Sequence, residues 1–258
     1  MRWVLINSGT KQLIGPLVPV QLEMGAITVV LQSGWRTMQR SRRVSFLYAG
    51  IVALVGLVIV RVLVMAGLAV LVPLAAAAFM LVAPILLAGF FGVARAVEAG
   101  KVGALHDLIE GFRQTPPVIL VLSLVCALLF MIFVTDVAIL YSYKAGGISV
   151  IPMEVLQPTE NMVQVLMWGS VSGAFFGLLV FTISAFSVPL ICERRVGLVG
   201  AVMASVRGVF VNRWVALVWA LLISLSTLIS ILVLPLLPFT LPPMAYASHA
   251  LYRQVFPA

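Results

Sequence analysis

Long, uninterrupted apolar runs constrain this sequence more than any other feature. They lie at residues 46–65, 68–94, 117–141, 165–191, 214–233 and 236–253, close to the ~20 residues with which an α-helix crosses about 30 Å of hydrocarbon. Backbone groups cannot stay unpaired in hydrocarbon, so only helices and closed barrels span it, and barrel strands would read as segments of about ten alternating residues. We therefore predict an all-α, polytopic transmembrane bundle of about six spans, formed by a single domain over residues 44–256.

The composition agrees, because 63% of the residues are apolar and 9% are charged, whereas soluble domains carry about a quarter charged residues. The formal net charge of +8 does not indicate a nucleic-acid partner, since the basic residues stand beside the spans. With the amino terminus inside, only Arg61 and Lys144 fall away from the inner side, so the positive-inside rule places both termini in the cytoplasm. The inner set is Arg2, Lys11, Arg36, Arg40, Arg42, Arg43, Arg95, Lys101, Arg113, Arg194, Arg195, Arg207, Arg213 and Arg253.

Residues 1–43 form a basic amino-terminal segment that is too polar to span. From Ile27 to Arg43 its apolar residues share a face opposite the arginines, which predicts a helix lying on the membrane surface. We expect the lipid bilayer to contact this helix through Arg36, Arg40, Arg42 and Arg43. The alternative is a solvated basic tail. Two further amphipathic segments, at residues 105–112 and 198–209, are predicted between spans.

Several prolines lie inside the predicted spans, and four of them are the candidate kink positions: Pro73, Pro84, Pro189 and Pro243. A proline in a helix interior removes one backbone hydrogen bond, so we predict a kink at each.

The three inner segments suggest an internal repeat. Each has an amphipathic stretch, then a basic residue, then an apolar hairpin whose second helix contains proline and ends in arginine. The entries are Gly34-Trp35-Arg36, Gly111-Phe112-Arg113 and Ser205-Val206-Arg207. Three surface-helix-plus-hairpin units would give a pseudo-symmetric bundle, although any six-helix protein with basic inner loops resembles this pattern.

Two ionisable residues inside the spans need separate consideration, Arg61 in the first and Asp136 in the third. Charges at membrane depth are rare and are functional-site candidates. Both lie near the outer boundary, so we predict an Arg61–Asp136 ion pair between the first two hairpins. The alternative is that Asp136 serves a substrate or proton site.

Groups for chemistry are scarce. Metal and haem sites need clustered His, Cys or carboxylate ligands, and neither His106 nor His249 has a second ligand at helical spacing. We expect His249 to be packed or hydrogen-bonded. There is no phosphate-binding loop, zinc-protease motif or G-x-S-x-G elbow, so neither a cofactor nor an enzyme activity is predicted.

Several short motifs carry a family resemblance. They are Gly34-Trp35-Arg36, Ala88-Gly89-Phe90-Phe91-Gly92 with Arg95, Phe186-Ser187-Val188-Pro189-Leu190, the run from Ala201 to Asn212, and Ala250-Leu251-Tyr252-Arg253. Over roughly Ser33 to Phe256 the chain resembles a proteobacterial family of predicted integral membrane proteins with a domain of unknown function, number two-one-eight-nine. The resemblance implies the bacterial inner membrane, six helices and no catalytic motif.

Three functions remain open. The first is a non-catalytic accessory, assembly or stabilising subunit, bound to a membrane-protein partner or in a homo-oligomer. The second is a small transporter or channel with Asp136 near its pathway, and the third is a scaffold that binds anionic lipid through the inner arginines.

Overall fold

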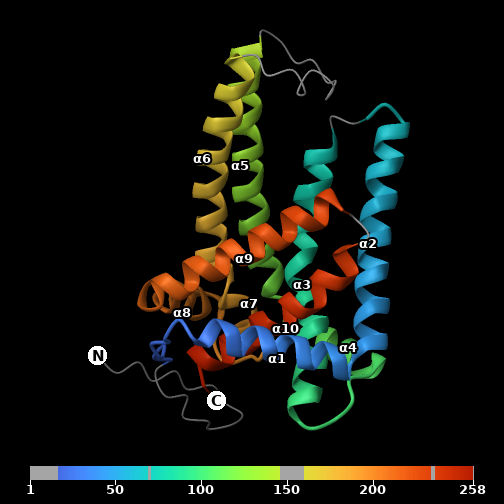
Figure 1. Ribbon diagram of the computed structural model, residues 1–258, viewed down its shortest axis with the longest axis vertical. Helices are drawn as coiled ribbons and strands as arrows, with labels where there is room; N and C mark the ends of the chain where they lie inside the picture. Colours follow the sequence, from blue (N-terminus) through green and yellow to red (C-terminus); the bar gives the residue numbers. More distant parts are fainter. Residues whose placement is uncertain (1–16, 69–70, 146–159, 234–235, 258) are drawn as a thin grey trace.

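The computed structural model describes residues 17–68, 71–145, 160–233 and 236–257 (Figure 1). Within these ranges the regular structure is helical, which confirms the predicted all-α fold. Residues 146–159, between the third and fourth predicted spans, and residues 1–16 of the basic amino-terminal segment lie outside the described residues. The helices are α1 (Ala26–Arg40), α2 (Arg42–Met65), α3 (Val72–Glu98), α4 (Leu105–Gln114), α5 (Ile119–Ala145), α6 (Glu160–Ser184), α7 (Ser187–Cys192), α8 (Leu198–Val211), α9 (Arg213–Leu232) and α10 (Leu237–Val255).

Five segments of the described chain are long and apolar enough to cross a membrane. They are Arg42–Met65, Leu74–Glu98, Ile119–Tyr143, Val163–Cys192 and Arg213–Ser230, and they match the first five predicted spans. The sixth prediction, 236–253, corresponds to α10, which is not among them. Polar side chains reduce the apolar character of α10, and most of its carboxyl-terminal half is buried inside the protein.

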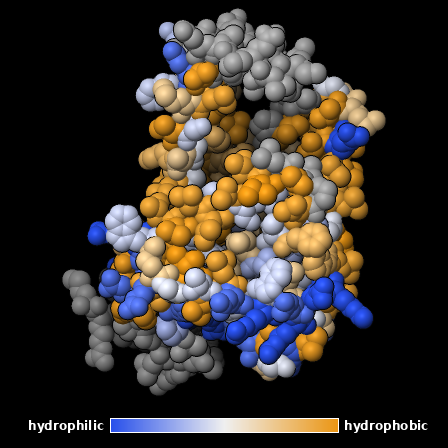
Figure 2. All heavy atoms as spheres, in the orientation of Figure 1, coloured by the Kyte–Doolittle hydropathy of each residue, from blue (hydrophilic) through white to orange (hydrophobic). Residues whose placement is uncertain are grey.

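Two layers can be distinguished in Figure 1. Helices α2, α5 and α6 run along the long axis, whereas α1 lies crosswise at the lower end and the α9–α10 hairpin crosses the molecule obliquely. We term α1, α4, α7, α8 and α10, together with the end of α3 that packs on them, the basal layer. Figure 2 shows hydrophilic atoms in a band at this end and hydrophobic atoms over most of the surface above it, as expected of a helix bundle standing in a bilayer.

Burial is concentrated at the basal ends of α2, α3 and α5. On α2 the buried residues are Ser45 and Ala49, near its start, and among the described side chains of α5 the last buried one is Cys126. The pattern is reversed on α3, which runs the other way, so that Phe90 and Val93 near its end are buried. The core of the protein therefore lies between the basal layer and the adjoining halves of the spans.

The helices follow the predicted threefold repeat. Each unit has a short helix and then a hairpin, giving α1–α3, α4–α7 and α8–α10. The short helix of each unit packs on the last part of the preceding unit: α4 on α3, and α8 on α6 and α7. Helix α1 packs on α10, which closes the arrangement into a ring.

A small residue from the predicted entry motifs lies at each of these three joints. A Cβ at Gly34 would lie 2.6 Å from the carbonyl oxygen of Pro243 and 2.7 Å from the Cβ of Ala247. The second joint brings Gly111 to Ala88 and Gly92 in the same way, with a Cβ at Gly111 colliding with the Ala88 carbonyl oxygen. Both short helices thus meet positions i and i+4 of the helix beneath them.

The third joint uses Ser205 at the equivalent place. Its hydroxyl donates to the carbonyl of Thr182 at 2.8 Å and accepts from the backbone N–H of Phe186 at 3.2 Å. In a continuous helix that N–H would bond directly to that carbonyl. The inserted hydroxyl separates α6 from α7, because a side chain placed in the hydrogen-bond ladder breaks it.

The proline predictions have three outcomes. Pro84 and Pro243 lie inside α3 and α10 as predicted. The prediction of a kink at Pro73 is wrong, because Pro73 lies in the first turn of α3. Backbone N–H groups in the first turn have no acceptor within the helix, so a proline there removes no helical hydrogen bond. For Pro189 the break comes earlier than predicted, between α6 and α7, at the place where Ser205 inserts.

The ends of the described chain are fastened together. The backbone N–H of Val20 donates to the carbonyl of Val255 at 2.9 Å. The Asn212 side chain accepts from the backbone N–H of Leu22 at 2.6 Å and donates to the carbonyl of Val20 at 3.0 Å. The segment before α1 is therefore held against both the α8–α9 junction and the end of α10.

Candidate functional site

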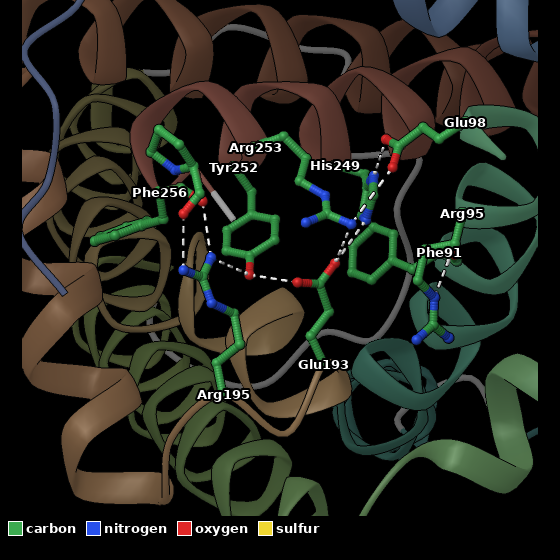
Figure 3. A network of polar contacts seen from close by, with 10 residues as sticks. Phe91, Arg95, Glu98, Glu193, Arg195, His249, Tyr252, Arg253 and Phe256 are labelled. Carbon is green, nitrogen blue, oxygen red and sulfur yellow. Dashed lines mark hydrogen bonds and ion pairs between the residues drawn. The ribbon is translucent and has the colours of Figure 1, made fainter. Parts of the chain in front are cut away.

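A network of ionisable side chains joins three elements of the basal layer around His249 (Figure 3). The imidazole Nδ1 lies 3.1 Å from Glu98 Oε1, and Nε2 lies 3.3 Å from Glu193 Oε1. The side chain of Arg253 approaches the same two carboxylates, at 3.5 Å and 3.4 Å. Two cationic groups of α10 thus lie between two carboxylates from elsewhere in the chain.

The network continues from Glu193 toward the end of α10. The Tyr252 hydroxyl donates to Glu193 Oε2 at 2.7 Å and accepts from the Arg195 guanidinium at 3.1 Å. Arg195 also donates to the carbonyls of Phe256 and Pro257, both at 2.8 Å. The final turn of α10 is thereby tied to the segment between α7 and α8.

Local structure explains why these side chains meet. His249, Tyr252 and Arg253 follow the i, i+3, i+4 spacing that puts residues on one helix face. Glu98 is the last residue of α3, and Glu193 directly follows α7. After it, Arg194 turns the chain with a positive φ of 54°, so that Arg195 reaches α10 from the same side as Glu193.

Burial and charge act in opposite directions on the two central groups, which both lie outside the five candidate spans. Burial by itself lowers the pKa of His249, but its contacts with the carboxylates of Glu193 and Glu98 outweigh burial and raise that pKa above 6.5. Burial by itself raises the pKa of Glu193, but hydrogen bonds from His249 and Tyr252 and the charge of Arg253 lower it below 4.5. The network therefore favours a protonated imidazole between ionised carboxylates.

Protonated His249 and Arg253 balance the two carboxylates in charge. His249 is 1% exposed and its ring packs on Phe91, with the centroids 5.3 Å apart. Among the residues that the structure describes, no group of three His, Cys, Asp or Glu side chains is arranged to hold a metal ion. This arrangement suits a fixed electrostatic connection between α3, α7 and α10 that a proton can modify.

The network was only partly accessible from the sequence. His249 is hydrogen-bonded and packed, as predicted, but Glu98 and Glu193 were not foreseen as its partners. Each is a single acidic residue where a long apolar run ends, and only the fold brings them together. The available signal was the single polar face formed by His249, Tyr252 and Arg253.

The predicted Arg61–Asp136 ion pair is wrong: no such pair forms, although both residues lie in the described part of the chain. Helix α2 packs on α3 and α10, whereas α5 packs on α3 and α6, and Figure 1 shows α2 and α5 on opposite sides of α3. Asp136 instead accepts a hydrogen bond from the Ser172 hydroxyl of α6. Both side chains lie on the outer half of the α5–α6 hairpin.

The arginines expected to contact lipid lie together at the basal end. Arg36 and Arg40 are exposed on α1, and Arg42 and Arg43 are exposed at the start of α2. The buried residues of α1 are Ile27, Val30, Gly34 and Met38, so the helix has the amphipathic character that the sequence predicts.

A known family model matches the middle of the chain and does not include helices α8–α10. Residues 71–193 match the family DUF2189, predicted integral membrane protein. The match runs from the start of α3 to Glu193, which is narrower than the predicted resemblance, and it includes Glu98 but not His249 or Arg253. No curated protein and no solved structure matches the chain. The DUF2189 match and the five candidate spans together identify an integral membrane protein.

Proposed function

We propose that this protein is a non-catalytic accessory, assembly or stabilising subunit of a larger complex in the bacterial inner membrane, with both termini in the cytoplasm. The observation that carries the proposal is the Asp136–Ser172 pair, which lies on a largely apolar, outward-facing hairpin. The charged side chains of the basal network, by contrast, pair with one another.

The outer part of the α5–α6 hairpin has much exposed apolar surface. Large side chains there that are more than half exposed include Leu128, Ile139, Trp168 and Phe175. Lipid alone could cover these, because lipid tails are as apolar as leucine. Lipid tails cannot, however, solvate the remaining acceptor positions of the Asp136 carboxylate, and an unsolvated charge in hydrocarbon is costly. A polar group on the helix of a partner protein would supply the missing donors.

The test is gentle extraction of the full chain from its native membrane, followed by native gel separation and mass spectrometry of the co-migrating proteins. We expect a defined partner that is lost from Asp136→Asn but retained by Glu110→Gln, which removes an acidic charge from α4 in the basal layer. Migration of the wild-type chain alone, or as a pure homo-oligomer, would contradict the proposal. So would equal retention of the partner by both variants.

A second function is favoured by one feature. A hollow of about 440 Å³ runs along α5 and is lined by Leu128, Met131, Ile132, Thr135, Asp136 and Ile139. A small transporter or channel would use Asp136 in such a hollow, although the lining is mostly apolar. Ion or solute flux into liposomes that depends on Asp136, measured with the protein free of partners, would favour this function over an accessory role.

A further inference from the structure

A groove of about 600 Å³ lies between α1 and α10 in the basal layer. It takes its lining from Leu31, Gln32, Trp35, Arg36 and Gln39 of α1 and from Phe239, Thr240, Pro243 and Met244 of α10. A volume of this size is in the range of sites for small ligands. The wall is firm on the α10 side, since the Phe239 ring packs edge to face on Phe46 of α2 at 4.9 Å.

The threefold repeat shows what is unusual about this groove. At the α3–α4 joint the residue after the small entry residue is Phe112, which is half-buried and packs on Tyr48, with ring centroids 6.0 Å apart. At the α1–α10 joint the equivalent residue is Trp35, which is 51% exposed and lines the groove. Phe112 therefore fills the α3–α4 joint, whereas Trp35 leaves the α1–α10 joint open to a ligand.

The polar groups of the groove favour an anion. Arg36 is its one charged lining residue, with Gln32 and Gln39 on the same face of α1. No carboxylate lines the groove to neutralise Arg36. A guanidinium with neighbouring amides is a good donor set for a phosphate group.

The residues that α10 contributes to the groove are mostly apolar. Helix α2 follows α1 directly and runs along the long axis, whereas α1 lies crosswise at the basal end (Figure 1). If α2 crosses the bilayer, α1 lies in the plane of its surface. Phe239, Pro243 and Met244 belong to the first half of α10, and the start of α10 lies further from the basal end than α1 does (Figure 1).

We propose that this groove holds one molecule of an anionic phospholipid from the surrounding bilayer. Its phosphate lies at Arg36, with Gln32 and Gln39 as further donors, and an acyl chain lies against Phe239, Pro243 and Met244. This site does not depend on the accessory role proposed above.

The test uses the full chain in detergent, mixed with phosphatidylglycerol or phosphatidylcholine, with retained lipid counted by native mass spectrometry. We expect one tightly retained phosphatidylglycerol and little phosphatidylcholine. Arg36→Gln should weaken retention about tenfold, as expected for loss of a charge-assisted hydrogen bond. The control Arg40→Gln, which removes an exposed charge of α1 outside the groove, should change it less than about twofold.

A second variant separates a shaped site from general attraction to positive charge. Gln32→Trp fills the groove from an exposed position without changing the charge, and it should abolish the tightly retained lipid. Equal losses for Arg36→Gln and Arg40→Gln, or full retention by Gln32→Trp, would overturn the proposal. Equal retention of both lipids by the wild-type chain would overturn it as well, and so would a dimer in which a second copy covers Trp35.

Discussion

The basal layer and the outer α5–α6 hairpin belong to one chain but satisfy their side chains in opposite ways. In the basal layer, buried aromatic side chains fill the space between helices, and His249 and Arg253 form ion pairs with Glu98 and Glu193. On the hairpin most large side chains face outward, and the Asp136–Ser172 pair is exposed. The basal layer is therefore held by contacts within the chain, and the hairpin depends on what surrounds it.

The strongest test of this difference between the basal layer and the α5–α6 hairpin is to truncate one phenylalanine in each region. Phe90 of α3 is 1% exposed and Phe175 of α6 is 65% exposed. We expect Phe90→Ala to lower the free energy of unfolding by about 3 kcal/mol, the low end for Phe→Ala, because hydrocarbon partly replaces water as the reference while the cavity remains. Phe175→Ala should change it by less than about 0.5 kcal/mol.

Unfolding by sodium dodecyl sulfate in mixed micelles, followed by tryptophan fluorescence, gives both values. Equal losses for the two variants would mean that the hairpin is packed as tightly as the basal layer.

A smaller difference is expected from adding a methyl group to one glycine in each region. At Gly34 the new methyl meets the backbone of α10, and overpacking of this kind costs about 2 kcal/mol. At Gly177 of α6 nothing lies within 4 Å, so the higher helix propensity of alanine should stabilise by up to about 1 kcal/mol. In the same unfolding assay, Gly34→Ala should lower the free energy of unfolding and Gly177→Ala should raise it. A Gly34→Ala variant as stable as the wild type would show that the close contact between α1 and α10 does not depend on this glycine.

The smallest effect concerns pH. The pKa of His249 is raised above 6.5, so the stabilisation from its protonated form is complete below that pH and is lost as the pH rises through the folded-state pKa. The pKa of Glu193 is lowered, so its contribution is present above pH 4.5 and is lost as the pH falls through its folded-state pKa. The free energy of unfolding should therefore be greatest between the lowered pKa of Glu193 and the raised pKa of His249.

His249→Gln should remove the alkaline part of this profile and leave the acid part, because Arg253 and Tyr252 still contact Glu193. Unfolding measured from pH 4 to pH 9 checks this, with Asp136→Asn as a control that should leave the profile unchanged. An unaltered alkaline limb in His249→Gln would assign that limb to another group.

Periodicity and charge predicted the framework of the fold because they act locally. The five long spans, the short helices and the order of the repeat follow from apolar length and from amphipathic faces, which are properties of neighbouring residues. The Arg61–Asp136 prediction failed because pairing depends on which helices are neighbours, and α3 separates α2 from α5. The partners of His249 were missed for the same reason, since Glu98 and Glu193 come from distant parts of the chain.

The break before α7 illustrates the limit in a different way. Proline is a visible signal, and Pro189 lies close to the break, but the hydroxyl that opens the ladder belongs to Ser205 of the next unit. The sixth span was overestimated because polar side chains such as His249 and Arg253 lower the apolar character of α10 below that of the other spans. The packing of α10 on α1 is a contact between the two ends of the described chain, and local sequence patterns do not show it.

The packing of α1 on α10 also has a consequence for the order of folding during biosynthesis. Helix α1 leaves the ribosome well before its main partner α10, and Leu22 is bound to a side chain 190 residues further on. At about 5–20 residues per second, α1 must wait on the order of ten seconds or more before its apolar face is covered. A chain that stalls or is cleaved before α10 would keep that face exposed, and a quality-control protease could recognise it as unfinished.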